Sequence, residues 1–155
     1  MGMNVVVGPP CAGKSTYARE AATDGEPVVD FDLLALAFGN TQQHSATGLI
    51  KRVTFEARDA AIALLKKNAD QGSWVIHTSP SVAELAEYAA LGAAFHLVDP
   101  GMAVCLARAQ SDERPEFTAS VIEGWYTNPP AMPEGTTTYS SAPVALLQAD
   151  HGFAD

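Results

Sequence analysis

The chain has 155 residues, 47% of them hydrophobic and 17% charged, which is enough for one domain with a packed core. Nine Lys and Arg against eighteen Asp and Glu give a net charge of −9, which argues against binding to extended duplex nucleic acid. No apolar run reaches the roughly 18 residues of a membrane span, and the N-terminus lacks the basic region of an export signal. We therefore expect a cytoplasmic protein with no membrane partner.

The first predicted strand, Met3–Val7, leads directly into the sequence Gly-Pro-Pro-Cys-Ala-Gly-Lys-Ser, which fits the phosphate-loop pattern G-x-x-x-x-G-K-[ST]. A stretch compatible with a helix, Ser15–Ala22, follows the loop. Loop amides and the positive end of the helix dipole together favour bound phosphate. We expect a nucleoside triphosphate to be bound by Gly8, Pro9, Pro10, Cys11, Ala12, Gly13, Lys14, Ser15 and Thr16.

Each residue type in this loop has a chemical reason to be there. Gly8 and Gly13 permit backbone angles and close approaches that a Cβ would block. Lys14 is expected to reach the β- and γ-phosphates, and the Ser15 hydroxyl to bind Mg²⁺. ATP, or another nucleoside triphosphate, and Mg²⁺ are therefore the predicted cofactors. The alternative is a glycine turn with a solvated lysine.

The second predicted strand, Pro27–Phe31, ends in two carboxylates. Asp32 is the candidate general base, because transfer to a hydroxyl needs a carboxylate to orient it and accept its proton. The alternative makes Asp32 the N-cap of a helix starting at Leu33. Asp30 is expected on the opposite pleat or within reach of a metal-bound water, so Ser15 and Asp30 are the candidate metal ligands.

A long amphipathic helix is predicted from Gly48 to Asp70. The polar stretch before it, Gly39–Gly48, contains His44 and is either a solvated segment or a substrate loop. The apolar face of the helix is predicted from three- and four-residue spacing. It consists of Ile50, Val53, Ala57, Ala60, Ala61 and Leu64, with Arg52, Glu56, Asp59 and Lys66 on other faces.

The third predicted strand, Ser73–His77, is followed by a capping-box sequence, Ser81-Val-Ala-Glu84, that opens a helix running to about Leu91. Gly92 is expected to end that helix. His77 at the strand end could touch substrate or a water near Mg²⁺, but a hydrogen-bonded structural role is the favoured interpretation. The same interpretation is favoured for Thr78 and Ser79.

The fourth predicted strand, Ala94–Val98, precedes two helices, Met102–Gln110 and Thr118–Tyr126. Arg108 and Arg114 lie in a segment, 108–118, that is a candidate lid, because a guanidinium can bind a transferring phosphoryl group with two hydrogen bonds. The alternative is a surface ion pair with Asp112 or Glu113. Trp125 and Tyr126 are expected in the core rather than against a base.

Residues 1–127 are therefore predicted to form the catalytic domain, and 128–155 a tail of the same domain. Residues 128–141 indicate an extended loop or partly disordered linker, and Pro143–Ala149 a short terminal helix. The two cysteines, Cys11 and Cys105, suggest no disulfide framework or metal cluster. Strands alternating with helices predict an α/β three-layer sandwich with a parallel sheet of four or five strands, and ligands bind at the carboxyl ends of such strands.

Taken together, these residues resemble the P-loop kinases, and among them the phage polynucleotide 5′-hydroxyl kinases and short phage-encoded P-loop proteins. The similarity spans about residues 3–126 and depends mainly on the phosphate loop, with support from Asp30-Phe-Asp32, Val75-Ile-His-Thr-Ser, Val98-Asp-Pro, Cys105-Leu-Ala-Arg108, Arg114-Pro and Ile122-Glu-Gly-Trp-Tyr126. It implies the P-loop nucleoside triphosphate hydrolase fold, Asp32 as the base, and contacts from Arg108 and Arg114 to the ATP phosphates.

Two departures from that family concern the acceptor. Polynucleotide kinases carry an arginine shortly after the base, whereas residues 33–38 here read Leu-Leu-Ala-Leu-Ala-Phe. His77 stands where the family has an acidic residue. Zeta-toxin-type kinases, which phosphorylate nucleotide sugars, share the general plan.

The leading hypothesis is an ATP-dependent kinase that phosphorylates a hydroxyl of a nucleoside, a nucleotide or a nucleic-acid end, including a hydroxymethylated base. The rival is an NTPase or nucleotide-dependent switch, weakly supported by Asp99 after the fourth strand. A third hypothesis is a binding module without catalysis, suggested by the missing arginine and by His77.

Overall fold

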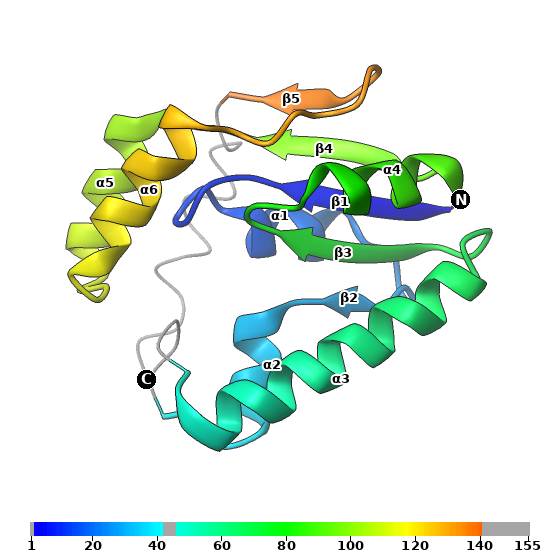
Figure 1. Ribbon diagram of the computed structural model, residues 1–155, viewed down its shortest axis with the longest axis horizontal. Helices are drawn as coiled ribbons and strands as arrows, with labels where there is room; N and C mark the ends of the chain where they lie inside the picture. The colour runs from blue at the N-terminus through cyan, green and yellow to red at the C-terminus, as the bar shows by residue number, and fades with distance from the viewer. Residues whose placement is uncertain (1, 42–45, 141–155) are drawn as a thin grey trace.

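The computed structural model describes residues 2–41 and 46–140. Its centre is a five-stranded parallel sheet in the order β2-β3-β1-β4-β5 (Figure 1), which confirms the predicted α/β fold. The strands are β1 (Met3–Val7), β2 (Val28–Val29), β3 (Ser73–His77), β4 (Ala94–Val98) and β5 (Thr137–Tyr139). The helices are α1 (Lys14–Ala21), α2 (Phe31–Ala37), α3 (Gly48–Lys67), α4 (Val82–Ala90), α5 (Met102–Ser111) and α6 (Phe117–Thr127).

Helices cover both faces of the sheet, because successive strand residues point to opposite sides and both sides are apolar. In β1, Val5 and Val7 join the core beneath α3 and α4, which also contains Ile62, Leu85 and Tyr88. Val6 joins the opposite core, beneath α1, α5 and α6. The result is the three-layer sandwich that the alternation of elements predicts. The predicted bounds of β1, β3 and β4 match those observed.

The second strand is shorter than the predicted Pro27–Phe31, since only Val28 and Val29 pair with β3. The reason is that Asp30 is the N-cap of α2: its Oδ1 accepts hydrogen bonds from the amides of Asp32 and Leu33. The alternative that made Asp32 the N-cap of this helix is therefore wrong. Asp32 lies inside the first turn of α2.

The predicted loop 128–141 contains the fifth strand. Thr137, Thr138 and Tyr139 pair in parallel with His96, Leu97 and Val98 of β4. The Tyr139 ring contacts the Tyr17 ring of α1, with 4.6 Å between centroids. Three β-branched threonines in a row suit an extended edge strand, but the pairing itself joins positions about forty residues apart.

Helix α3 buries a face that matches the predicted one only in part: Ala61 packs against the core as predicted. Val53 and Leu64 are exposed, whereas Thr54 and Ile62 are buried. Thr54 can be buried because its hydroxyl donates to the carbonyl of Ile50 at 2.6 Å. Thr54 was missed because apolar spacing alone ignores polar side chains that find partners within the fold.

Two expectations cannot be compared with the structure. His44 and the predicted helix Pro143–Ala149 both lie outside the described residues. Within residues 2–41 and 46–140, no helix combines the length and apolar character that crossing a bilayer requires.

Candidate active site

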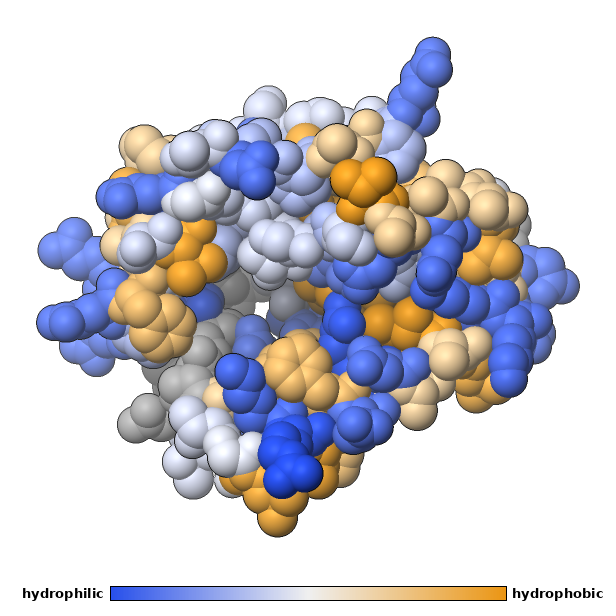
Figure 2. Space-filling view, in the orientation of Figure 1, coloured by the Kyte–Doolittle hydropathy of each residue, from blue (hydrophilic) through white to orange (hydrophobic). Residues whose placement is uncertain are grey.

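All five strands point in one direction, so their carboxyl ends form one edge of the sheet (Figure 1). The phosphate loop (residues 8–16) follows β1, Asp30 follows β2, His77 ends β3 and Asp99 follows β4. On the face shown in Figure 2, the surface is hollowed between α5–α6 and α2–α3. Sequence-distant polar groups therefore meet at this edge, where open α/β sheets bind ligands.

The phosphate loop has the backbone geometry of an anion-binding concavity. A Cβ on Gly8 would lie 2.4 Å from the carbonyl oxygen of Val98, so only glycine fits between β1 and β4. Cys11 and Gly13 have φ angles of 64° and 94°, in the left-handed region. The close approach and the unusual angle expected at the two loop glycines are thus both present. Left-handed residues between right-handed ones turn successive amides towards one point.

Helix α1 begins immediately after this concavity, with Gly13 as its N-cap. The first amides of a helix have no acceptor inside the helix, so Lys14, Ser15 and Thr16 present donors and the positive end of the dipole to the loop. The Lys14 side chain and these main-chain amides together would bind a triphosphate, and the shape of the loop fits that group. Pro9 and Pro10 contribute shape rather than donors, because proline has no amide hydrogen.

Lys14 is the cation at the centre of the crevice. Its Nζ donates to the carbonyl of Pro9 at 2.7 Å. Burial lowers the pKa of Lys14 to about 8, and several neighbouring groups, the Asp32 and Asp30 carboxylates among them, act in the opposite direction. A bound phosphate would raise the Lys14 pKa again, because it stabilises the ammonium form.

Ser15 and Asp30 were predicted to hold Mg²⁺. Asp30 is 5% exposed, and the two hydrogen bonds that it accepts both involve Oδ1, so the carboxylate keeps further acceptor capacity. Among the described residues, no group of three or more His, Cys, Asp or Glu side chains could hold a metal. A hydroxyl, one carboxylate, water and phosphate oxygens are nevertheless a usual Mg²⁺ ligand set, so the residues fit an ion that arrives with the nucleotide.

Of the two candidate lid arginines, Arg108 reaches the phosphate loop with hydrogen bonds. Arg108, in the last turn of α5, donates from Nη1 to the carbonyls of Cys11 at 3.1 Å and Ala12 at 3.3 Å. Arg114 is half-buried in the turn between α5 and α6. Burial raises the pKa of the Cys11 thiol, and Arg114 is the first of the charges that oppose this rise. Arg108 thus contacts the loop directly, and Arg114 acts on it through its charge.

His77 belongs to a hydrogen-bonded network on the α3–α4 side of the sheet. Its Nδ1 lies 3.1 Å from Arg58 Nη2 and its Nε2 lies 2.8 Å from the Tyr88 hydroxyl. Because arginine can only donate, Nδ1 is the acceptor and Nε2 carries the proton. Burial, with Arg58 second, lowers the His77 pKa to about 4. These contacts fit the structural role that the sequence favours.

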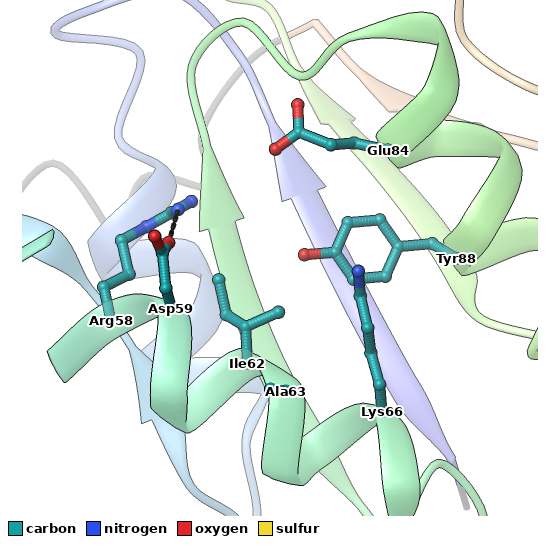
Figure 3. Close-up of a pocket in the computed structure, with 7 residues that line it drawn as sticks. All are labelled: Arg58, Asp59, Ile62, Ala63, Lys66, Glu84 and Tyr88. Carbon is teal, nitrogen blue, oxygen red and sulfur yellow. Dashed lines mark ion pairs between the residues drawn. The ribbon is translucent and has the colours of Figure 1, made fainter. Parts of the chain in front are cut away.

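A pocket of about 190 Å³ opens beside this network, between α3 and α4 (Figure 3). Arg58 enters it from α3 and Glu84 from α4, while the Lys66 ammonium lies 4.8 Å from the centre of the Tyr88 ring. Glu84 also closes the predicted capping box, because its carboxylate accepts from the amide of Ser81. Arg58 is the residue of this region that the sequence analysis missed.

The remaining polar residues at the edge serve the fold. Asp99 Oδ1 accepts hydrogen bonds from the Gly101 amide and the Tyr126 hydroxyl, which joins β4 to α5 and α6. Trp125 is 6% exposed and donates from Nε1 to the carbonyl of Thr78 at 2.8 Å. Trp125 is therefore a core residue. The Asp99 carboxylate is directed towards Gly101, the N-cap of α5, and not presented as a metal ligand.

No protein-family model matches the chain, and no curated protein matches it at a significant level. Solved structures do resemble it. A protein from Chloroflexus aurantiacus described as a candidate kinase aligns over 100% of both chains with a TM-score of 0.57 and 11% identity. A sugar kinase from a Janibacter species aligns over 99% of this chain and 94% of its own, with a TM-score of 0.54 and 16% identity.

The tunicamycin resistance protein of Deinococcus radiodurans aligns over 98% of this chain and 96% of its own, with a TM-score of 0.50 and 12% identity. At these identities the likeness shows a shared fold. Two of the three structures carry kinase descriptions. The chain therefore has a fold found in proteins described as kinases, and its own site residues must carry the argument about chemistry.

Proposed function

We propose that the protein is an Mg²⁺- and ATP-dependent kinase that transfers the γ-phosphoryl group to a hydroxyl of a nucleoside, nucleotide or nucleic-acid end. One observation carries this proposal. The phosphate loop with Lys14 follows β1, its Cys11 and Ala12 carbonyls accept hydrogen bonds from Arg108, and Asp30 and Asp32 follow β2 at the same edge of the sheet. Phosphoryl transfer needs this combination of anion binding, metal binding and a base.

Each residue of the candidate site has a separate task in this scheme. The loop amides and Lys14 bind the phosphates, and Arg108 and Arg114 neutralise charge on the transferring group. Ser15 and Asp30 hold Mg²⁺, which neutralises the phosphate oxygens when it is bound. Asp32 orients the acceptor hydroxyl and accepts its proton. ATP could be replaced by another nucleoside triphosphate without changing these tasks.

The rival hypothesis, a nucleotide-dependent switch, requires a metal-holding acid after a hydrophobic strand. Asp99 was the candidate, and its Oδ1 accepts from the Gly101 amide and the Tyr126 hydroxyl. The geometry therefore favours the kinase.

A phosphate-transfer assay tests the proposal. The protein is incubated with γ-labelled ATP and pooled nucleosides, nucleotides and 5′-hydroxyl oligonucleotides, and labelled products are counted. Asp32→Asn should lower kcat by about 10²–10⁴-fold and leave the Kd for ATP unchanged, because the amide keeps the shape and loses the base. Asp24→Asn, an exposed aspartate between α1 and β2, is the matched control and should retain full activity.

Two results would contradict the proposal. One is ATP binding without a labelled product from any acceptor in the pool. The other is transfer that Asp32→Asn leaves at the wild-type rate.

A further inference from the structure

The pocket between α3 and α4 lies outside the candidate active site. Its described lining residues include neither Asp30 nor Asp32 and no residue of the phosphate loop. On α3 the lining runs from Arg58 to Lys66, about 12 Å along the helix at 1.5 Å per residue. Because α3 ends shortly before β3 begins, this direction leads away from the carboxyl ends of the strands. A pocket of about 190 Å³ is smaller than a drug-sized site, so it suits a small molecule.

The Arg58 guanidinium keeps hydrogen-bond donors available for a ligand. Its Nη2 donates to the Ile76 carbonyl at 3.3 Å and to His77 Nδ1 at 3.1 Å. Asp59 lies 3.8 Å from Nη1, too far for a hydrogen bond, and its side chain is 71% exposed. Within the described part of the chain, Nη1 and Nε form no hydrogen bond. The Arg58 side chain is 14% exposed, and a sheltered cation with so little compensation favours an anionic group.

Tyr88 supplies a second donor, from a residue that is 1% exposed. Since His77 Nδ1 accepts from Arg58, His77 Nε2 carries the proton and donates to the Tyr88 hydroxyl oxygen at 2.8 Å. The hydroxyl hydrogen of Tyr88 is then left over, and no described residue accepts it. A buried donor without an acceptor costs free energy. Figure 3 shows this hydroxyl pointing into the pocket, where a ligand oxygen would satisfy it.

The α4 side of the pocket carries negative charge. Glu84 enters from the first turn of α4, and its Oε2 accepts from the Ser81 amide at 2.7 Å. A carboxylate has several acceptor positions, so Glu84 retains capacity for a ligand donor. Lys66, the other cation of the lining, is paired with Glu87 at 2.5 Å. A simple anion bound at Arg58 would be repelled by Glu84, whereas a ligand that also carries a positive group would be attracted by both.

We infer that this pocket binds a small zwitterion of the α-amino acid class. Its carboxylate accepts hydrogen bonds from Arg58 and Tyr88, and its ammonium group donates to Glu84. A short apolar side chain contacts Ile62 and Ala63, which form the apolar part of the lining. This site is separate from the crevice and goes beyond the proposed transfer of phosphate.

Calorimetric titration of the protein with three probes tests the inference. L-Alanine carries both charged groups, propionate only the carboxylate and ethylamine only the ammonium group. L-Alanine should bind at least about tenfold more tightly than either of the others, because each of them lacks one set of charge-assisted hydrogen bonds. Lys14→Met should bind L-alanine like the wild type, since Lys14 does not line the pocket.

Two substitutions separate the ends of the ligand. Glu84→Gln removes the negative charge and keeps an oxygen that can close the capping box. It should weaken L-alanine binding about tenfold and should not weaken propionate binding. Tyr88→Phe removes only the hydroxyl, so it should weaken L-alanine and propionate about tenfold and leave ethylamine unchanged. Glu56→Gln, at an exposed position of α3, is the matched control for Glu84→Gln and should change none of the affinities.

Arg58→Lys tests the guanidinium itself. The substitution keeps the charge but not the forked donor geometry, so it should weaken L-alanine and propionate and leave ethylamine unchanged. Arg52→Lys, at an exposed position of the same helix, is its control and should bind all three probes like the wild type. Thermal denaturation confirms that each variant folds.

Several outcomes would overturn the inference. They are no binding of any probe, equal affinities for the three probes, or a folded Tyr88→Phe variant that binds L-alanine as tightly as the wild type. Loss of L-alanine binding in Lys14→Met would place the amino acid in the crevice and would also overturn it. Absence of phosphate transfer together with the expected L-alanine binding would contradict only the kinase proposal.

Discussion

The two sides of the crevice are built in different ways. The side proposed for the nucleotide consists of nine consecutive residues, Gly8 to Thr16, at the junction of β1 and α1. The side proposed for the acceptor starts from Asp32 in α2, which lies beside α3 and the end of β3, elements up to about forty-five residues apart. Main-chain amides can be arranged by a short segment, whereas recognition of an acceptor needs side chains from several elements. The first kind of site is visible as a motif, and the second is not.

Replacing Lys14 should have the largest effect and should separate function from stability. Lys14→Met should lower kcat by about 10²–10³-fold, because a cation aimed at the phosphates is lost. The same change should raise the free energy of unfolding at pH 7 by about 1 kcal/mol, since the folded state no longer shelters a charge whose pKa is depressed to about 8. Transfer assays and thermal denaturation measure the two effects.

The pH dependence provides the control for this interpretation. Folded wild type loses the Lys14 proton near pH 8 and the unfolded chain near 10.5, so its relative stability should rise across that interval. ATP affinity should fall over the same interval as the ammonium is lost. Lys14→Met should show neither change, and an unchanged pH profile would mean that the lysine is not sheltered.

Replacing Gly8 shows how far the nucleotide side depends on the rest of the fold. Gly8→Ala should lower the free energy of unfolding by about 2–4 kcal/mol, because its Cβ would lie 2.4 Å from the Val98 carbonyl. Gly124→Ala is the matched control in α6, where a Cβ meets no heavy atom within 4 Å. It should be stabilising by about 1 kcal/mol. Equal effects of the two changes would contradict the close contact of β1 with β4.

Acid should weaken the His77 network that joins β3 to α3 and α4. The folded His77 pKa is about 4 against 6.5 in the unfolded chain, so its contribution is complete above pH 6.5 and declines as the pH falls towards 4. We expect wild type to lose about 1–3 kcal/mol more than His77→Gln over this interval. Chemical denaturation at several pH values measures the difference. Parallel curves for the two proteins would show that the imidazole is not held neutral.

The smallest effect on stability is expected from a substitution in β5, which contacts α1 through the Tyr139 ring. Tyr139→Ala should lower the free energy of unfolding by about 1 kcal/mol through loss of the ring contact with Tyr17. ATP affinity should remain within about twofold, if the phosphate loop holds its shape locally. Thr138→Ala, an exposed neighbour, is the control. A large loss of ATP affinity in Tyr139→Ala would show that the loop depends on β5.

Much of the fold could be predicted because several signals are local. Val-rich β1, the capping box of Ser81 and Glu84, and Gly92 with a φ of 74° at the end of α4 each follow from a few neighbouring residues. The predictions failed where a distant partner decides. Asp30 rather than Asp32 caps α2, and residues 137–139 become a strand because β4 offers an open edge.

The candidate site divides along the same line. The nine loop residues, the two carboxylates and the two arginines were named from sequence, and the structure shows Arg108 in contact with the loop. Arg58 was missed because its partners, the Ile76 carbonyl and the His77 ring, lie on β3 and are distant in the sequence.

The sequence by itself determined the order of the first four strands along the chain and the position of the phosphate loop. It also determined the chemistry that the glycines, lysine and serine of the loop permit. These features depend on backbone angles and short-range hydrogen bonds. Only the tertiary structure decided which side chains face the loop across the crevice. Those contacts join residues far apart in the chain, and their geometry is set by how α3 packs on the sheet.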